Sequence, residues 1–175
     1  DEKNNTLRLY FTNDDQLISL NAKTGEPIKS FGHNGIVKIG SSSIPPAIID
    51  NKLIVATFRP SIEAYDVENG KLYWKYYLRE INEENFGERD FIGGFPWGGL
   101  SADTKNGIVY LSTGNPKPNF VGTLRPGKNL FANSLIAFDI RNKKKLWHFQ
   151  ETCHDIWNHD IPSPPILTTI KMDRV

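Results

Sequence analysis

The chain has 175 residues, of which 38% are hydrophobic and 23% are charged, and its formal net charge is +1. This composition is ordinary for a globular domain, and the near-neutral charge gives no electrostatic reason to expect a nucleic-acid or anionic-membrane partner. No apolar run approaches the ~18 residues that a membrane-spanning helix needs. The single cysteine, Cys153, excludes an internal disulfide.

Short apolar runs recur along the chain, and each is bounded by Asp, Asn, Gly, Pro or Lys. In chain order they are LRLYFT (7–12), QLISLNA (16–22), KLIVATF (52–58), SIEAYDV (61–67), KLYWKYYL (71–78), GIVYLST (107–113), SLIAFDI (134–140) and KKLWHFQ (144–150). The runs are rich in β-branched and aromatic residues, which is typical of strands joined by tight turns. No segment shows a sustained helical period, so the sequence predicts an all-β fold.

Three segments carry variants of one pattern: an apolar strand, an acidic or amide residue, a turn and a second apolar strand. They are SLNAKTGEPI (19–28), AYDVENGKLYW (64–74) and AFDIRNKKKLW (137–147), and their anchors are Asn21, Asp66 and Asp139. A tryptophan, Trp74 or Trp147, follows each aspartate by eight residues, and Phe31 lies near the corresponding point of the first copy. We expect each anchor to hold its turn through the local backbone, and each tryptophan to pack between neighbouring units.

The spacing of the anchors predicts a propeller. The first two anchors are 45 residues apart, and a period near that length with four strands per unit is typical of a propeller blade. The second spacing is 73 residues, and INEENFGERDFIGGFPWGG (81–99) would be an insertion. We therefore predict a β-propeller with four-stranded antiparallel blades. Because propellers close with about four to eight blades, residues 1–175 would supply about three of them, as part of a longer propeller domain.

Three stretches resemble the pyrroloquinoline-quinone (PQQ)-dependent dehydrogenases, most closely the quinoprotein glucose dehydrogenase branch. They are KTGEPIKSFGHNGIV (23–37), STGNPKPNFVGTLRPGKNLFANSLIAFD (112–139) and WHFQETCHDIWNHDIPSPP (147–165). The resemblance implies an eight-bladed propeller that holds PQQ and calcium near its axis. It also implies oxidation of glucose or a related sugar or alcohol, with electrons passed to a quinone or cytochrome acceptor.

The resemblance also implies a periplasmic or other extracytoplasmic location, and membrane anchoring stays open. The opening residues, DEKNNTLRLYF, contain no apolar signal core. Any export signal would therefore lie upstream of this sequence or have been removed.

Five positions match cofactor or metal contacts of that family. Asn115, in STGNP, matches an asparagine whose amide oxygen ligates calcium, a hard cation. Trp97, in GGFPWGG, matches the tryptophan beneath the planar quinone, where flanking glycines allow a close backbone approach. Ser43, Thr57 and Arg59 match polar positions near the carboxylates of the cofactor. Each residue also has a structural interpretation, as a turn residue or, for Trp97, as a core tryptophan.

The loop HDIWNHDIP (154–162) departs from the family pattern. The resemblance places a catalytic aspartate directly after the tryptophan, but this chain has Asn158, whose amide cannot accept a proton at neutral pH. The alternative bases are Asp160 and His154, since histidine as a residue type can accept a proton near neutral pH. Asp155 would pin the turn. A zinc site is disfavoured, since the sequence has no CxxC pair and no HExxH helix.

A second departure concerns the metal. Relatives that oxidise methanol carry a calcium-binding glutamate in the loop that here reads ATFRPS, whereas Glu63 would fall inside the following strand. Two other functions therefore stay open: a cofactor-free propeller scaffold, such as an outer-membrane assembly lipoprotein, and a carbohydrate-binding propeller. The long strings around Trp97 and Asn115 favour the dehydrogenase, while Asn158 favours an inactive relative.

Overall fold

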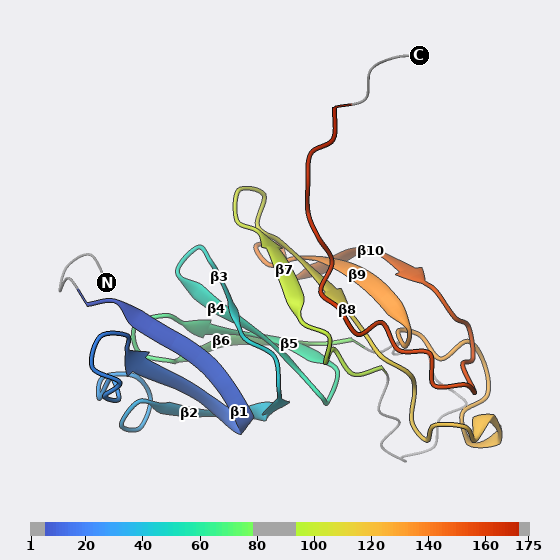
Figure 1. Ribbon diagram of the computed structural model, residues 1–175, viewed down its shortest axis with the longest axis horizontal. Helices are drawn as coiled ribbons and strands as arrows, with labels where there is room; N and C mark the ends of the chain where they lie inside the picture. Colours follow the sequence, from blue (N-terminus) through green and yellow to red (C-terminus); the bar gives the residue numbers. More distant parts are fainter. Residues whose placement is uncertain (1–5, 79–93, 172–175) are drawn as a thin grey trace.

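The computed structural model describes residues 6–78 and 94–171, and this part of the chain forms three antiparallel sheets set side by side (Figure 1). The strands are β1 (Arg8–Asn21), β2 (Ile36–Ser42), β3 (Ala47–Ile49), β4 (Lys52–Thr57), β5 (Ser61–Asp66), β6 (Leu72–Tyr77), β7 (Leu100–Asp103), β8 (Ile108–Ser112), β9 (Ser134–Asp139) and β10 (Lys144–Gln150). The one helical element of the described residues is a 3₁₀ turn, η1 (Gly122–Leu124). The all-β prediction is confirmed.

We call the β1–β2 sheet blade 1, the β3–β6 sheet blade 2 and the β7–β10 sheet blade 3. In blades 2 and 3 each strand pairs with the next along the chain, as the prediction of four-stranded antiparallel blades requires. Blade 1 differs within the described residues, because β1 spans 14 residues and folds back on itself: the N–H of Ala22 donates to the carbonyl of Leu7 at 2.8 Å, across the two ends of the element. β1 also pairs with β2, with a register shift between Asp14 and Gln16. Most of the predicted insertion, up to residue 93, lies outside the described residues.

The repeated anchors hold their turns through the backbone, as predicted. In each copy one side-chain oxygen accepts hydrogen bonds from the N–H groups two and three positions later. The distances are 2.9 and 3.3 Å at Asn21, 2.8 and 2.9 Å at Asp66, and 2.9 and 2.9 Å at Asp139. Hydrogen bonds from the backbone and side chain of Asn142 hold the pKa of Asp139 below its ordinary value. Each turn is therefore fixed by its own sequence.

The β4 strand of blade 2 is buried on both faces. Successive side chains of a strand point to opposite faces, and in β4 Leu53 and Val55 join a core with blade 1, while Ile54 and Ala56 join a core with blade 3. All four side chains are at most 2% exposed. This double burial explains why KLIVATF is apolar throughout, without the polar alternation of a strand that has one wet face.

The two blade tryptophans occupy equivalent positions. Trp74 lies opposite Ala64 and Trp147 lies opposite Ala137, and a register shift precedes each pair. The ring of Trp74 lies 5.9 Å from that of Phe138 in blade 3, which confirms packing between blades. Trp147 contacts Tyr110 of its own blade and is 46% exposed, so its packing against a further blade stays a prediction.

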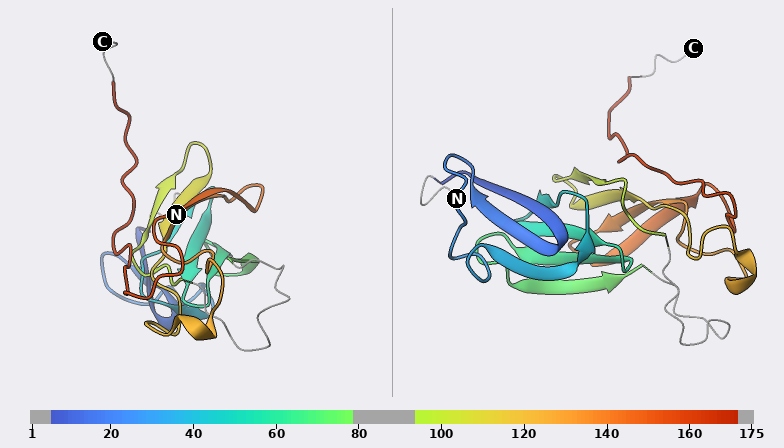
Figure 2. Two further views of the ribbon diagram at one scale, coloured as in Figure 1. Left: turned by 90° about the vertical axis from the view of Figure 1, so that its right-hand side faces the viewer. Right: turned by 60° about the horizontal axis from the view of Figure 1, so that its bottom comes forward.

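After β10 the chain is irregular and then extends away from the sheets (Figure 2). Its residues 163–165 lie along blade 3, where Ser112 Oγ donates a 2.9 Å hydrogen bond to the carbonyl of Ser163 and Ser101 Oγ donates to that of Pro165. These contacts direct the preceding loop toward one end of the blade. Among the described residues, no helix has the length and apolar character to cross a membrane.

Candidate active site

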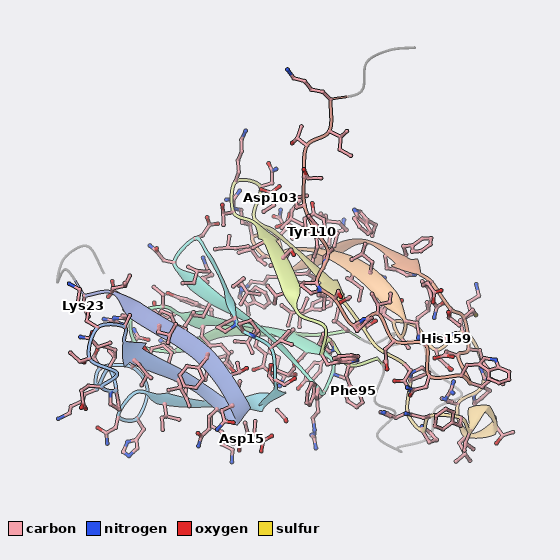
Figure 3. All side chains as sticks on the ribbon, in the orientation of Figure 1. Asp15, Lys23, Phe95, Asp103, Tyr110 and His159 are labelled. Atoms are coloured by element: carbon pink, nitrogen blue, oxygen red, sulfur yellow. The ribbon has the colours of Figure 1, made fainter. Side chains whose placement is uncertain are left out.

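The candidate site lies at one end of blade 3. Antiparallel strands that follow one another reverse direction at each turn. The segment before β7, the connection from β8 to β9 and the segment after β10 therefore meet at the same end of the sheet. Figure 3 shows two residues of these segments, Phe95 before β7 and His159 after β10, on that side of the molecule.

Four of the predicted site residues meet there around one carboxylate. Asp160 Oδ1 accepts hydrogen bonds from the backbone N–H of Asn115 at 2.7 Å and from Trp97 Nε1 at 3.3 Å. Asp160 Oδ2 accepts a longer bond, 3.5 Å, from Asn158 Nδ2. We call Trp97, Asn115, Asn158 and Asp160 the Asp160 centre. All four were predicted from the sequence as site residues, and the structure brings them together from three separate segments.

Gly114 makes this convergence possible. A Cβ at this position would collide with Asp160 Oδ1 and would lie 2.6 Å from Trp97 Nε1. The neighbouring Asn115 is only 4% exposed, whereas Trp97 is 40% exposed. The glycine of STGNP is therefore required by a close approach between three segments.

His154 lies in different surroundings from Asp160. Its Nδ1 is 2.8 Å from the carbonyl oxygen of Gly127, and a Cβ on Gly122 would lie 2.5 Å from its Nε2. Both ring nitrogens thus face the loop that contains η1, while the Asp160 carboxylate faces Trp97 and Asn115. The structure separates the two predicted bases.

A fully buried arginine supports this loop, and sequence analysis gave it no role. Arg125 Nε donates to the carbonyl of Pro118 at 2.9 Å, Nη1 donates to Asn129 Oδ1 at 2.6 Å, and Nη2 donates to the carbonyl of Asp155. Burial lowers the pKa of the Arg125 guanidinium, although Asp155 acts in the opposite direction. In the sequence, Arg125 is marked only by its place in the turn-like stretch RPGKN. Nothing in that stretch indicates that the side chain is buried.

Asp155 pins the turn that carries Asn158 and Asp160, as predicted. Its Oδ1 accepts the N–H of Trp157 at 2.8 Å, and its Oδ2 accepts the N–H of His159 at 2.7 Å. The Asn133 side chain also donates to Oδ2 at 3.2 Å. With 2% of its surface exposed, Asp155 is a structural anchor of the loop and lies away from solvent.

The other predicted cofactor contacts lie in blade 2 and in the connection that precedes it, between β2 and β3. Ser43 is exposed in the connection between β2 and β3. Thr57 is fully buried, and its Oγ1 contacts the Arg59 carbonyl at 2.7 Å and Ser61 Oγ at 2.6 Å. Arg59 is exposed and lines a cavity of about 560 Å³. Within the described residues, none of these three side chains is hydrogen-bonded to the Asp160 centre.

The cavity and the Asp160 centre are neighbours through Phe95. This residue lines the cavity, and its carbonyl accepts hydrogen bonds from the N–H groups of Trp97 at 2.9 Å and Gly114 at 2.8 Å. The remaining lining residues come from β2 and from blade 2: Lys38, Ile39, Gly40, Ser41, Phe58, Glu63, Tyr65, Leu72 and Lys75. The cavity therefore reaches across blades 1 and 2 to the start of blade 3.

Glu63 lies within β5, as expected, and is committed to local partners. Its carboxylate is 2.6 Å from Lys75 Nζ and accepts hydrogen bonds from Ser61 Oγ at 3.0 Å and from the Tyr65 hydroxyl. Burial, together with the bond to Glu63, raises the pKa of the Tyr65 phenol. The predicted calcium ligand, Asn115, lies instead beside the Asp160 carboxylate. No group of three His, Cys, Asp or Glu side chains suited to a metal occurs in the described part of the chain.

Comparison with known proteins identifies the family of the chain. Residues 1–175 match the family described as "PQQ: Glucose/ethanol/alcohol dehydrogenase, beta-propeller domain". The chain is 34% identical over 185 residues to quinoprotein glucose dehydrogenase A of Acinetobacter calcoaceticus, covering 91% of this chain and 23% of that protein. It is 29% identical to the glycerol dehydrogenase large subunit of Gluconobacter thailandicus, over 89% of this chain and 25% of that subunit.

The fold is similar to that of a solved propeller enzyme. Quinohemoprotein alcohol dehydrogenase from Comamonas testosteroni superimposes with a TM-score of 0.76 at 25% identity, over 94% of this chain and 29% of that one. The β-propeller prediction is thereby confirmed. The chain spans about a quarter of the length of the relatives that it matches.

Proposed function

The chain belongs to the PQQ-dependent glucose, ethanol and alcohol dehydrogenase family, and on that premise we propose that the Asp160 centre is part of a site that oxidises a sugar or alcohol hydroxyl. The observation that carries the proposal is the convergence of Trp97, Asn115 and Asp160 from three separate segments. Bound PQQ would accept the electrons from the substrate carbon, a step that amino-acid side chains do not supply.

The residues of the centre fit a flat cofactor and a hard cation. The partly exposed indole of Trp97 would stack against the cofactor, and its N–H is held by Asp160, which fixes the plane of the ring. The Asn115 amide oxygen is a neutral oxygen donor of the kind that calcium takes alongside carboxylates. The glycine at position 114 leaves room for a close approach at this point.

Asp160 is the residue of the centre that can take the hydroxyl proton. A carboxylate accepts a proton, whereas the amide of Asn158 cannot at neutral pH. Three N–H donors orient the Asp160 carboxylate. His154 keeps its Nδ1 against the Gly127 carbonyl and is the weaker candidate.

The substrate, acceptor and location are finer proposals. A relative that is 34% identical is a quinoprotein glucose dehydrogenase, which supports glucose or a related aldose as substrate over a simple alcohol. We further propose a quinone or cytochrome as electron acceptor, calcium as the cation and an extracytoplasmic location. These follow from the resemblance of the sequence to this family.

The first test is a binding experiment on the full-length protein. PQQ with calcium should raise the melting temperature, because a ligand that binds only the folded state stabilises it, by about 2.7 kcal/mol at a concentration 100 times its dissociation constant. Asn115→Ala should reduce the calcium-dependent part of this rise. Asn106→Ala, in the turn at the opposite end of blade 3, is the matched control. An unchanged melting temperature at saturating PQQ and calcium would favour a cofactor-free scaffold.

A second measurement needs no cofactor. Terbium replaces calcium at oxygen sites, and its luminescence is sensitised by a nearby indole. Because Trp97 Nε1 and Asn115 N share Asp160 Oδ1, an ion held at Asn115 would lie close to the Trp97 ring. Terbium luminescence excited through tryptophan should therefore fall in Trp97→Phe and in Asn115→Ala. Equal luminescence in wild type and both variants would argue against a cation at this site.

A further inference from the structure

Asn119 lies beside Asn158 and has no part in the function proposed above. It follows Pro118 in the connection from β8 to β9, and its Nδ2 donates a 2.6 Å hydrogen bond to Asn158 Oδ1, 39 residues later in the sequence. Asn158 in turn donates from Nδ2 to Asp160 Oδ2. The three side chains form a chain of hydrogen bonds that ends on the carboxylate.

The chemistry of the three groups fixes the direction of this chain. An ionised carboxylate can only accept hydrogen bonds, so Asp160 requires the N–H side of the Asn158 amide. The oxygen side of Asn158 must then face Asn119, and Asn119 must present its own N–H side. A turn of either amide by 180° would place two oxygens or two N–H groups against each other. The N–H group of Asn119 and the carboxylate of Asp160 therefore favour the same orientation of the Asn158 amide.

The remaining contacts of Asn119 indicate that this bond is the reason for its placement. Its Oδ1 is buried and has no hydrogen-bond partner within the part of the chain that the structure describes. A buried acceptor without a donor is unfavourable, so the bond from Nδ2 to Asn158 is the contact that favours this placement of the Asn119 side chain. Asn119 uses only its N–H side, and it uses that side on Asn158.

We propose that Asn119 is a positioning residue, which holds the Asn158 amide with its N–H group toward Asp160 and so keeps the carboxylate in place for the substrate hydroxyl. This inference rests on the proposed role of Asp160 as the proton acceptor. It gives Asn158 a defined task, as a donor that orients Asp160, at the position where the family pattern has an aspartate. Asn119 acts through Asn158 and touches no reacting atom.

The test uses the full-length protein labelled with 5-fluorotryptophan. Trp97 Nε1 donates to the same carboxylate, so its ¹⁹F signal, assigned with Trp97→Phe, reports movement of Asp160 in the absence of cofactor. Asn119→Ala should shift this signal. Asn119→Asp, which keeps the size of the side chain but removes its donor, should shift it further because Asn158 must turn its oxygen toward Asp160. Asn106→Ala, at the other end of the blade, should leave the signal unchanged.

Kinetics of the PQQ- and calcium-loaded protein supply the second readout. Asn119→Ala should lower kcat about 10-fold with little change in KM, since the residue positions a base and binds no substrate. The same substitution should have no further effect in an Asn158→Ala background, where the connection to Asp160 is already lost. Effects that add fully in the double variant would show that Asn119 acts independently of Asn158 and would overturn the proposal.

The two proposals fail in different ways. If Asn119→Ala and Asn119→Asp leave both the Trp97 signal and kcat unchanged, the positioning role is wrong, and the proposed dehydrogenase function is unaffected. If the wild-type protein oxidises no aldose or alcohol, the proposed function is wrong, and the catalytic part of the inference falls with it. A Trp97 signal that still depends on Asn119 would then support only the orientation of Asn158.

Discussion

The Asp160 carboxylate accepts a 2.7 Å hydrogen bond from the backbone N–H of Asn115, 45 residues earlier in the chain. The bond ties the loop after β10 to the loop after β8. Because the donor is a backbone group, substitution of the Asn115 side chain leaves it in place. The amide oxygen of Asn115 can therefore be tested as a metal ligand without displacing Asp160.

Asp160→Asn should lower kcat of the loaded full-length protein by about 10²–10⁴-fold, the usual effect of removing a general base. His154→Ala should have a much smaller effect, because its ring is held against the Gly127 carbonyl. The measurement is steady-state oxidation of a panel of aldoses and alcohols. A larger loss in His154→Ala than in Asp160→Asn would reverse the assignment.

Asn158→Asp provides the complementary control for this prediction. It restores the carboxylate of the family pattern at the position where this chain has an amide. If this variant is active and the wild type is not, the protein is a silenced relative and Asp160 is not a working base.

Arg125→Ala should destabilise the protein by about 3 kcal/mol, since it removes a fully buried side chain and leaves three buried acceptors without their donor. Arg125→Lys should lose most of the same stability, because an ammonium group cannot reproduce the planar set of guanidinium donors. Thermal melting and limited proteolysis of residues 151–161 measure the effect. Wild-type stability in Arg125→Lys would show that charge alone is sufficient.

Trp74→Ala should lower the free energy of unfolding by about 2 kcal/mol, below the ~3–5 kcal/mol of a fully buried aromatic side chain, because Trp74 is only partly buried. The loss arises from its contact with Phe138 across the two blades. Tyr77→Ala, at an exposed position of the same strand, is the control and should cost less than about 1 kcal/mol. Equal losses would argue against packing between blades as the cause.

Asp139→Asn should destabilise the protein at pH 7 by less than about 1 kcal/mol, because asparagine can still accept both backbone N–H bonds, as Asn21 does, and only the charge of the cap is lost. The pKa of Asp139 is lowered in the folded state, so its contribution is present above the unfolded pKa of about 3.9 and is lost as the pH falls through the folded pKa. The difference between wild type and variant should therefore shrink in acid. The control is Asn21→Asp, at the matching turn of blade 1, which should be neutral or slightly stabilising at pH 7. If the difference between wild type and Asp139→Asn is the same at every pH, the electrostatic explanation is wrong.

The features that the sequence predicted well are local. The turns at Asn21, Asp66 and Asp139 depend on side chains that bond to N–H groups two and three residues away, so the repeat alone reveals them. The matching places of Trp74 and Trp147 follow from the same repeat. Both are consequences of short segments that fold in the same way wherever they occur.

The features that the sequence did not reveal depend on packing between distant loops. Arg125 reaches Asp155 across 30 residues, and Asn119 reaches Asn158 across 39. No periodicity or spacing relates such pairs, because their contact is decided by how two irregular segments lie on the end of blade 3.

The Asp160 centre is assembled from residues 97–160, which belong to a single blade, whereas the walls of the neighbouring cavity extend over blades 1 and 2 and meet blade 3 at Phe95. The groups proposed to react with the substrate and the wall beside them therefore come from different blades. A substitution at Lys38 in blade 1 or at Leu72 in blade 2 would change the space beside the site without removing a hydrogen bond of the Asp160 centre. The room for a bound molecule and the alignment of the reacting groups are thus set by separate parts of the sequence.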